Sequence, residues 1–124
     1  MNSFELAKKI SGILEDRHAG DVEIIDLTEK STIADYFVVA TAKNTSHVRA
    51  LCDEVEEGLE KEEIFVSRKE GLRDGRWAVV DYGDVIVHIF NDETRLFYHL
   101  ERLWMDGGNM ERFDDESGEF VSKA

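Results

Sequence analysis

Two short apolar segments separated by only two residues constrain the fold of this chain most. Residues 77–82 and 85–90 are rich in β-branched and aromatic side chains, and Gly83 and Asp84 link them. A glycine at the first of two central positions suits a type II′ turn, whose twist matches that of paired strands. The sequence therefore predicts an antiparallel β-hairpin.

The register of this hairpin predicts two different faces, because successive side chains of a strand point to opposite sides. One face is apolar and is expected to lie in the core: Ala78, Val80, Tyr82, Val85, Val87 and Ile89. The other face is mixed: Trp77, Val79, Asp81, Ile86, His88 and Phe90. A helix could cover this mixed face, as the layers of α/β domains suggest. Alternatively, it could dock a protein, because tryptophan-centred patches with a polar rim are typical anchors.

The rest of the chain shows helical and strand patterns in turn. Helices are expected where apolar side chains recur every three or four positions, over residues 3–18, about 45–59 and about 92–104. Further strands are expected over residues 21–27, 33–41 and 64–66. The order α-β-β-α-β-β-β-α predicts an α/β fold, in which helices pack on a mixed β-sheet.

The length predicts one domain, which we place at residues 1–104, followed by an acidic, flexible tail at 105–124. No apolar run reaches the roughly 18 residues of a membrane span, and the first residues lack the pattern of a signal peptide. A single cysteine, Cys52, excludes an intrachain disulfide and fits a reducing compartment. We expect a cytoplasmic protein that does not enter a membrane.

The formal net charge of −13 indicates which partners suit the chain. Such an acidic protein repels polyphosphate backbones, so direct DNA binding is not expected. Lys69 and Arg73 belong to a basic loop, but acidic residues are interspersed with them, and a solvated loop is the preferred interpretation. Acidity favours a basic protein partner, because complementary charge speeds encounter.

Tests for reaction chemistry mostly fail. The sequence contains neither a phosphate-binding GxxxxGK[ST] loop nor a GxGxxG fingerprint, and its histidines lack metal-ligand spacing. Asp81 and Asp84 could hold a divalent metal for nucleotidyl transfer. However, they straddle the hairpin turn, so their directions diverge, and Asp84 has the routine explanation of a turn residue. We expect no metal, no cofactor and no catalytic residue.

Three segments together resemble the ribosomal silencing factor family, also called the Iojap-like family. They are ADYFVVAT at 34–41, EGLRDGRWAVVDYGDVIVHIF at 70–90 and RLFYHLERLW at 95–104. The resemblance covers about residues 2–104. It implies a fold similar to that of nucleotidyltransferases but without their catalytic motif, and no enzymatic activity.

The resemblance also implies a partner and a mechanism. Members bind the fourteenth protein of the large ribosomal subunit, block joining of the 50S and 30S subunits, and lower translation when nutrients are scarce. Members also form homodimers. Carried over to this chain, the resemblance assigns partner contact to Trp77, Asp81, Tyr82, Gly83, Asp84 and His88, with contributions from Lys69 and Arg73. Two alternatives stay open: a ribosome-assembly factor, as in some organellar relatives, and a nucleotidyltransferase-like enzyme that uses Asp81 and Asp84.

Overall fold

The structure is a computed structural model that describes residues 1–29, 32–91, 110–114 and 119–122. The helices and strands in these ranges are α1 Ser3–Asp16, β1 Gly20–Asp26, β2 Tyr36–Ala42, α2 Thr45–Glu60, β3 Arg68–Glu70, β4 Trp77–Asp81, β5 Val85–Asn91, β6 Met110–Asp114 and β7 Glu119–Ser122. No helix within these ranges is both long enough and apolar enough to span a membrane.

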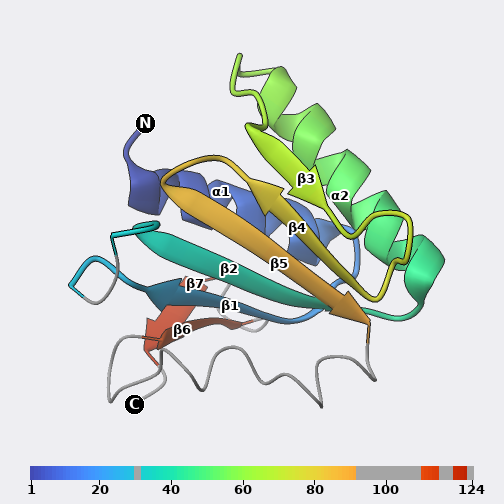
Figure 1. The fold of residues 1–124 in the computed structure, drawn as a ribbon. Helices are drawn as coiled ribbons and strands as arrows, with labels where there is room; N and C mark the ends of the chain where they lie inside the picture. Colours follow the sequence, from blue (N-terminus) through green and yellow to red (C-terminus); the bar gives the residue numbers. More distant parts are fainter. Residues whose placement is uncertain (30–31, 92–109, 115–118, 123–124) are drawn as a thin grey trace.

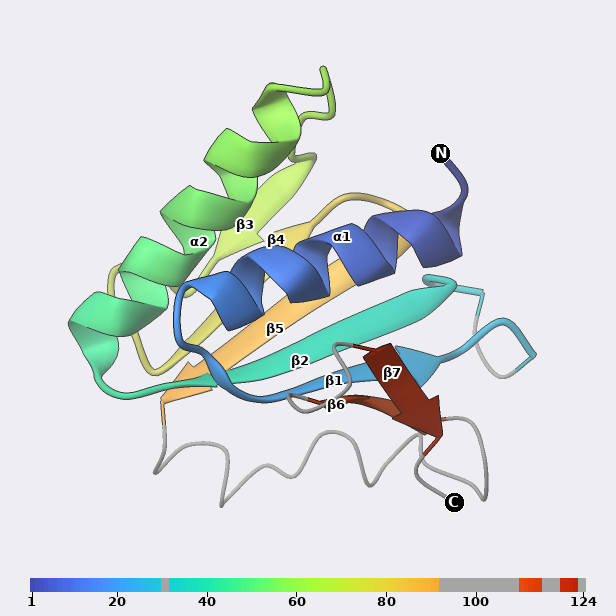
Figure 2. The same ribbon diagram turned by 180° about the vertical axis from the view of Figure 1, so that it is seen from behind.

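The strands form one mixed sheet in the order β3-β4-β5-β2-β1-β6-β7. β2 and β5 pair in parallel, and the other neighbours pair antiparallel. Both α1 and α2 lie on the same face of this sheet, as the two opposite views show (Figures 1 and 2). The predicted α/β fold with helices on a mixed sheet is confirmed, although helices cover only one face in the part of the chain that the structure describes.

The main core lies between these helices and the sheet. α1 begins after Asn2, whose side chain accepts a hydrogen bond from the Glu5 amide, and α2 begins after Asn44, which caps the His47 amide in the same way. Such caps satisfy amides that the first helical turn leaves without partners. The helices bury apolar side chains at helical spacing: Ala7, Ile10 and Leu14 from α1, and Val48, Leu51, Val55 and Leu59 from α2. They meet alternate residues of the sheet, including Val38, Ala40, Ala78, Val80, Val87 and Ile89.

A second apolar cluster lies on the sheet face opposite the helices. Its buried members are Ile25, Leu27, Ala34, Phe37, Val39, Ile86 and Phe90. Trp77 and Val79 of β4 are half-buried and pack against it. Because β2 contributes to both clusters, both of its faces are buried, which explains its nearly continuous apolar sequence.

The hairpin follows the predicted register. Trp77 pairs with Phe90, and Val79 pairs with His88. Both pairs lie on the sheet face opposite the helices, which we call the second face. Gly83 has a φ of +89°, the positive value that a type II′ turn requires at its first central position. The Tyr82 amide donates a hydrogen bond of 2.9 Å to the Val85 carbonyl and closes the strands before the turn.

The predicted element order is matched only roughly. The strand expected at 64–66 is wrong, because Ile64 and Val66 pack against the core without pairing, while the charged residues of β3 pair with β4 at the sheet edge. No element was predicted within 105–124, yet β6 pairs with β1, and β7 pairs with β6. The helix expected at about 92–104 lies outside the described residues.

Candidate functional site

The residues predicted to contact a partner do not form one compact patch. Trp77, Asp81 and His88 lie on the second face of the sheet, because each alternates with a core residue along β4 or β5. Gly83 and Asp84 form the exposed turn between these strands. The other three predicted residues lie elsewhere.

Trp77 is held by two ring contacts of different kinds. Its indole stacks on Phe90 with ring centroids 5.0 Å apart and planes at 23°. Its Nε1–H donates a hydrogen bond of 3.1 Å to Nδ1 of His88. Trp77 is therefore half-buried in a fixed orientation, with one ring face against the cluster. A rigid, part-exposed indole of this kind is a typical anchor for a protein partner.

His88 supports Trp77 from within the sheet. Its side chain is buried, and Phe37 packs against it at 4.5 Å with the rings edge to face. Burial lowers the pKa of His88 from 6.5 to about 4, against a smaller, opposite effect of the Asp81 carboxylate. The imidazole is therefore neutral at pH 7, and since Nδ1 accepts from Trp77, Nε2 carries the proton. This Nε2 is buried without a hydrogen-bond partner among the described residues.

The acidic turn is fixed by main-chain bonds. Oδ1 of Asp81 accepts a hydrogen bond of 2.7 Å from the Gly83 amide, a local bond typical of aspartate in turns. The Asp84 carbonyl accepts from the amides of Asp35 at 2.8 Å and Tyr36 at 3.1 Å. These bonds tie the turn to the start of β2 and leave the Asp84 side chain exposed. Asp84 is therefore the turn carboxylate best placed to meet another molecule.

Tyr82 and Lys69 lie on the helix side instead. Tyr82 packs against the main core, and its hydroxyl is buried without a partner among the described residues. Burial raises the pKa of Tyr82 well above its usual range, and the Glu56 and Glu60 carboxylates add to this effect. The Lys69 ammonium is paired with the Glu56 carboxylate at 3.1 Å. Tyr82 and Lys69 therefore do not lie on the second face, and their contact with a partner stays a prediction.

Arg73 lies in the loop between β3 and β4, beside α2, and its side chain is exposed. Sequence reasoning missed the residue that holds this loop. Arg49 of α2 donates from Nε to the Leu72 carbonyl and from Nη2 to the Arg73 carbonyl, both at 2.9 Å. No local pattern could have indicated these bonds, because Arg49 is 23 and 24 residues away from its partners along the chain.

The described residues offer little for reaction chemistry. In the ranges that the structure covers, no group of three His, Cys, Asp or Glu side chains is close enough together to hold a metal ion. Burial, followed by the Asp53 and Glu56 carboxylates, raises the pKa of Cys52 to about 12, so the sulfur is a protonated thiol at neutral pH. It is a core side chain and a poor nucleophile.

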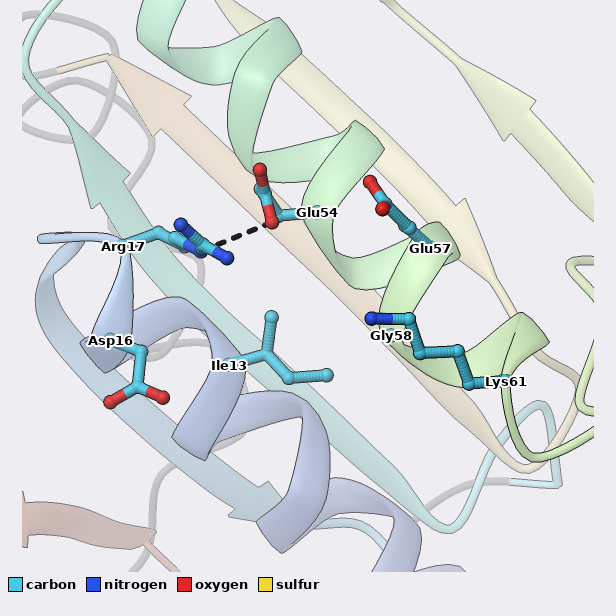
Figure 3. A pocket seen from close by; sticks show the side chains of 7 residues that line it. All are labelled: Ile13, Asp16, Arg17, Glu54, Glu57, Gly58 and Lys61. Carbon is cyan, nitrogen blue, oxygen red and sulfur yellow. Dashed lines mark ion pairs between the residues drawn. The ribbon is translucent and has the colours of Figure 1, made fainter.

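A small cavity lies between the two helices, away from the predicted contact residues. It has a volume of about 120 Å³ and is lined by Ile13, Asp16, Arg17, Glu54, Glu57, Gly58 and Lys61. Figure 3 shows the Arg17–Glu54 ion pair across its upper end, and the two groups are 3.0 Å apart. Its lining mixes acidic and basic groups around Ile13, so it presents no single chemistry to a ligand.

The sequence matches one known protein family over nearly its whole length. The family model described as "Ribosomal silencing factor during starvation" matches residues 1–123. The chain belongs to the RsfS family. The resemblance expected from the sequence is therefore confirmed.

Individual relatives agree with this assignment. The chain is 34% identical over 106 residues to a ribosomal silencing factor RsfS of Bacillus subtilis, covering 86% of this chain and 90% of the relative. It is 36% identical over 119 residues to RsfS of Zymomonas mobilis, covering 96% of this chain and 84% of that relative. A crystal structure of a Chromobacterium violaceum protein superposes with a TM-score of 0.81 at 31% identity, covering 84% of this chain and 87% of that one. The RsfS relatives are named as silencing factors and not as enzymes.

Proposed function

We propose that this RsfS-family chain binds the large ribosomal subunit through its fourteenth protein and blocks joining of the 30S subunit. Translation is thereby repressed when nutrients are limiting. The family match over residues 1–123 carries this proposal. The mechanism is steric and needs no covalent step, since the bound chain occupies the surface that the small subunit requires.

The geometry of the hairpin supports this function. We define the docking surface as Trp77, Asp81, Gly83 and Asp84, with the buried His88 supporting Trp77 from behind. Arg73, in the loop beside α2, is proposed as a separate contact. Within the docking surface, Trp77 is a fixed, half-buried apolar anchor, and Asp84 offers a carboxylate at the rim. A central aromatic with a charged rim is the arrangement that protein interfaces favour. The net charge of −13 suits a basic protein and disfavours the surrounding RNA.

The bonds of the turn argue against the enzymatic alternative. Metal-assisted nucleotidyl transfer by Asp81 and Asp84 would need both carboxylates directed at one ion. Oδ1 of Asp81 instead accepts a hydrogen bond from the Gly83 amide at 2.7 Å. A thermal shift with nucleotide and magnesium tests this alternative: the docking function predicts no shift, and a clear rise in melting temperature would favour the enzyme.

A matched pair of charge variants tests the docking surface. Asp84→Ala removes an exposed carboxylate from the turn, and Glu57→Ala removes one from α2 on the opposite side of the sheet. Binding to purified 50S subunits should weaken about two- to fivefold for Asp84→Ala, the size of an exposed charge contact, and stay unchanged for Glu57→Ala. The Asp84 effect should shrink as salt is added. Equal effects of both variants would show that only net charge matters and would contradict a specific surface.

We also propose that the chain is cytoplasmic and forms a homodimer when free of the ribosome, as the family resemblance implies. Sedimentation equilibrium of the purified chain tests the second point. A mass twice that of the 14.2 kDa chain is expected at micromolar concentration. A mass of one chain throughout the concentration range would refute the homodimer and leave ribosome binding to be judged separately.

A further inference from the structure

The loop between β3 and β4 is tightly constrained at both ends. Gly71 and Gly75 have φ values of +79° and +73°, and the Gly75 amide donates to the Gly71 carbonyl at 2.9 Å. A Cβ added at Gly71 would lie 1.9 Å from the Trp77 carbonyl oxygen, so the loop begins directly against the start of β4. At its other end, the Arg76 carbonyl accepts from the Asn91 amide at 3.0 Å.

Arg49 fixes the middle of this loop to α2. One guanidinium donates to two successive carbonyls, those of Leu72 and Arg73, each at 2.9 Å. Because the guanidinium is planar and its donors are rigidly spaced, two such bonds set both the position and the orientation of the loop backbone. Gly75 also packs closely on the first turn of α2, where an added Cβ would lie 2.9 Å from Cβ of Thr45. The loop accordingly lies beside the start of α2 in both views (Figures 1 and 2).

The side chain that this arrangement presents is Arg73. The other basic side chains nearby have carboxylate partners: Lys69 with Glu56, Arg68 with Glu70, and Arg76 with Asp74. Arg73 is exposed, and the described part of the chain gives its guanidinium no such partner. Arg49 is similarly free of carboxylates among the described residues, since its bonds go to main-chain carbonyls. One arginine thus holds the backbone that carries the other.

We propose that Arg49 is a positioning residue for partner binding: it holds the loop between β3 and β4 so that the exposed Arg73 guanidinium donates to an acceptor group of the ribosomal partner. Arg49 itself touches no partner. Its effect on binding passes through Arg73, and this inference rests on the proposed function. At Gly71 the same loop lies directly against the main chain of Trp77, the first residue of β4.

A double-mutant cycle tests this role. Affinity for purified 50S subunits is measured for Arg49→Gln, Arg73→Ala and the double variant, with Arg17→Gln as the matched control. Arg17 has an equal charge, paired with Glu54 in the helix layer. Arg49→Gln should weaken binding about fivefold, which is about 1 kcal/mol, and Arg73→Ala should do the same. The double variant should be no weaker than either single variant, because the two residues act as one unit. Arg49→Lys, which keeps the charge but lacks the paired donors, should be intermediate.

Amide hydrogen exchange gives an independent measurement. The Gly75 amide, bonded to the Gly71 carbonyl, should exchange faster in Arg49→Gln than in the unaltered chain. An unchanged affinity of Arg49→Gln, or an effect that adds in full to that of Arg73→Ala, would overturn the positioning role. If Arg49→Gln does not fold, the same cycle with Arg49→Lys decides between these outcomes. The unaltered chain is measured first. If it does not bind 50S subunits, the proposed function itself is refuted, independently of the positioning role.

Discussion

Acidification should destabilise this protein through one buried histidine. The side chain of His88 is only 7% exposed, and its Nδ1 must stay unprotonated to accept the Trp77 indole N–H. Its pKa is about 4 in the folded chain, compared with 6.5 for an ordinary histidine. The unfolded chain therefore binds more protons between these values, so stability is full above pH 6.5 and falls as the pH drops toward 4. With each pKa unit equivalent to about 1.4 kcal/mol, the loss at pH 4 is about 3 kcal/mol.

Urea unfolding followed by circular dichroism measures this loss. Many carboxylates also titrate in this range, so the free energy of unfolding of the unaltered chain is compared with that of His88→Gln at each pH. The side chain of glutamine offers a carbonyl acceptor but does not titrate. The difference between the two proteins should be constant above pH 6.5 and should change by about 3 kcal/mol in favour of His88→Gln by pH 4. A difference that stays constant down to pH 4 would refute a buried, neutral His88.

Three further predictions concern the fold. Cys52 has a pKa of about 12 and no exposed surface. It should therefore not react with a thiol reagent at pH 8 until the chain is unfolded in denaturant. Rapid reaction of the folded chain would show that the core opens. Gly71→Ala should destabilise the domain by about 2 kcal/mol or more in chemical unfolding, because its φ is +79° and the added methyl group meets the Trp77 carbonyl. Gly12→Ala, in the middle of α1 with open space around it, should instead stabilise the domain by about 0.5–1 kcal/mol, and similar effects of both variants would contradict the loop geometry.

The hairpin could be predicted because its evidence is local. Alternating apolar residues, a two-residue link and Gly83 fix both the register and the two faces without reference to the rest of the chain. The helices α1 and α2 were found for a similar reason, since their buried side chains recur at helical spacing. Strand β3 carries no such signal. Its three residues are charged and exposed, and pairing with β4 alone makes them a strand.

The candidate site was predicted in part. The pattern placed Trp77, Asp81 and His88 on one face, and the structure confirms this arrangement. Two bonds could not be predicted. The bond from the Gly83 amide to Asp81 depends on the side-chain rotamer of Asp81. The pairing of Lys69 with Glu56 depends on the position of α2. The role of Arg49 depends on a contact between elements that are distant in sequence, which no periodicity reports.

The central claim is that the chain binds free 50S subunits at the surface where the 30S subunit joins. The most direct test adds the tagged chain to a ribosome preparation that contains both 50S subunits and 70S ribosomes, and separates the particles on a sucrose gradient. The chain should sediment with the 50S subunits and be absent from the 70S peak, because the assembled ribosome covers its binding surface. Equal amounts on 50S and 70S particles would show that it binds elsewhere and would contradict the steric mechanism.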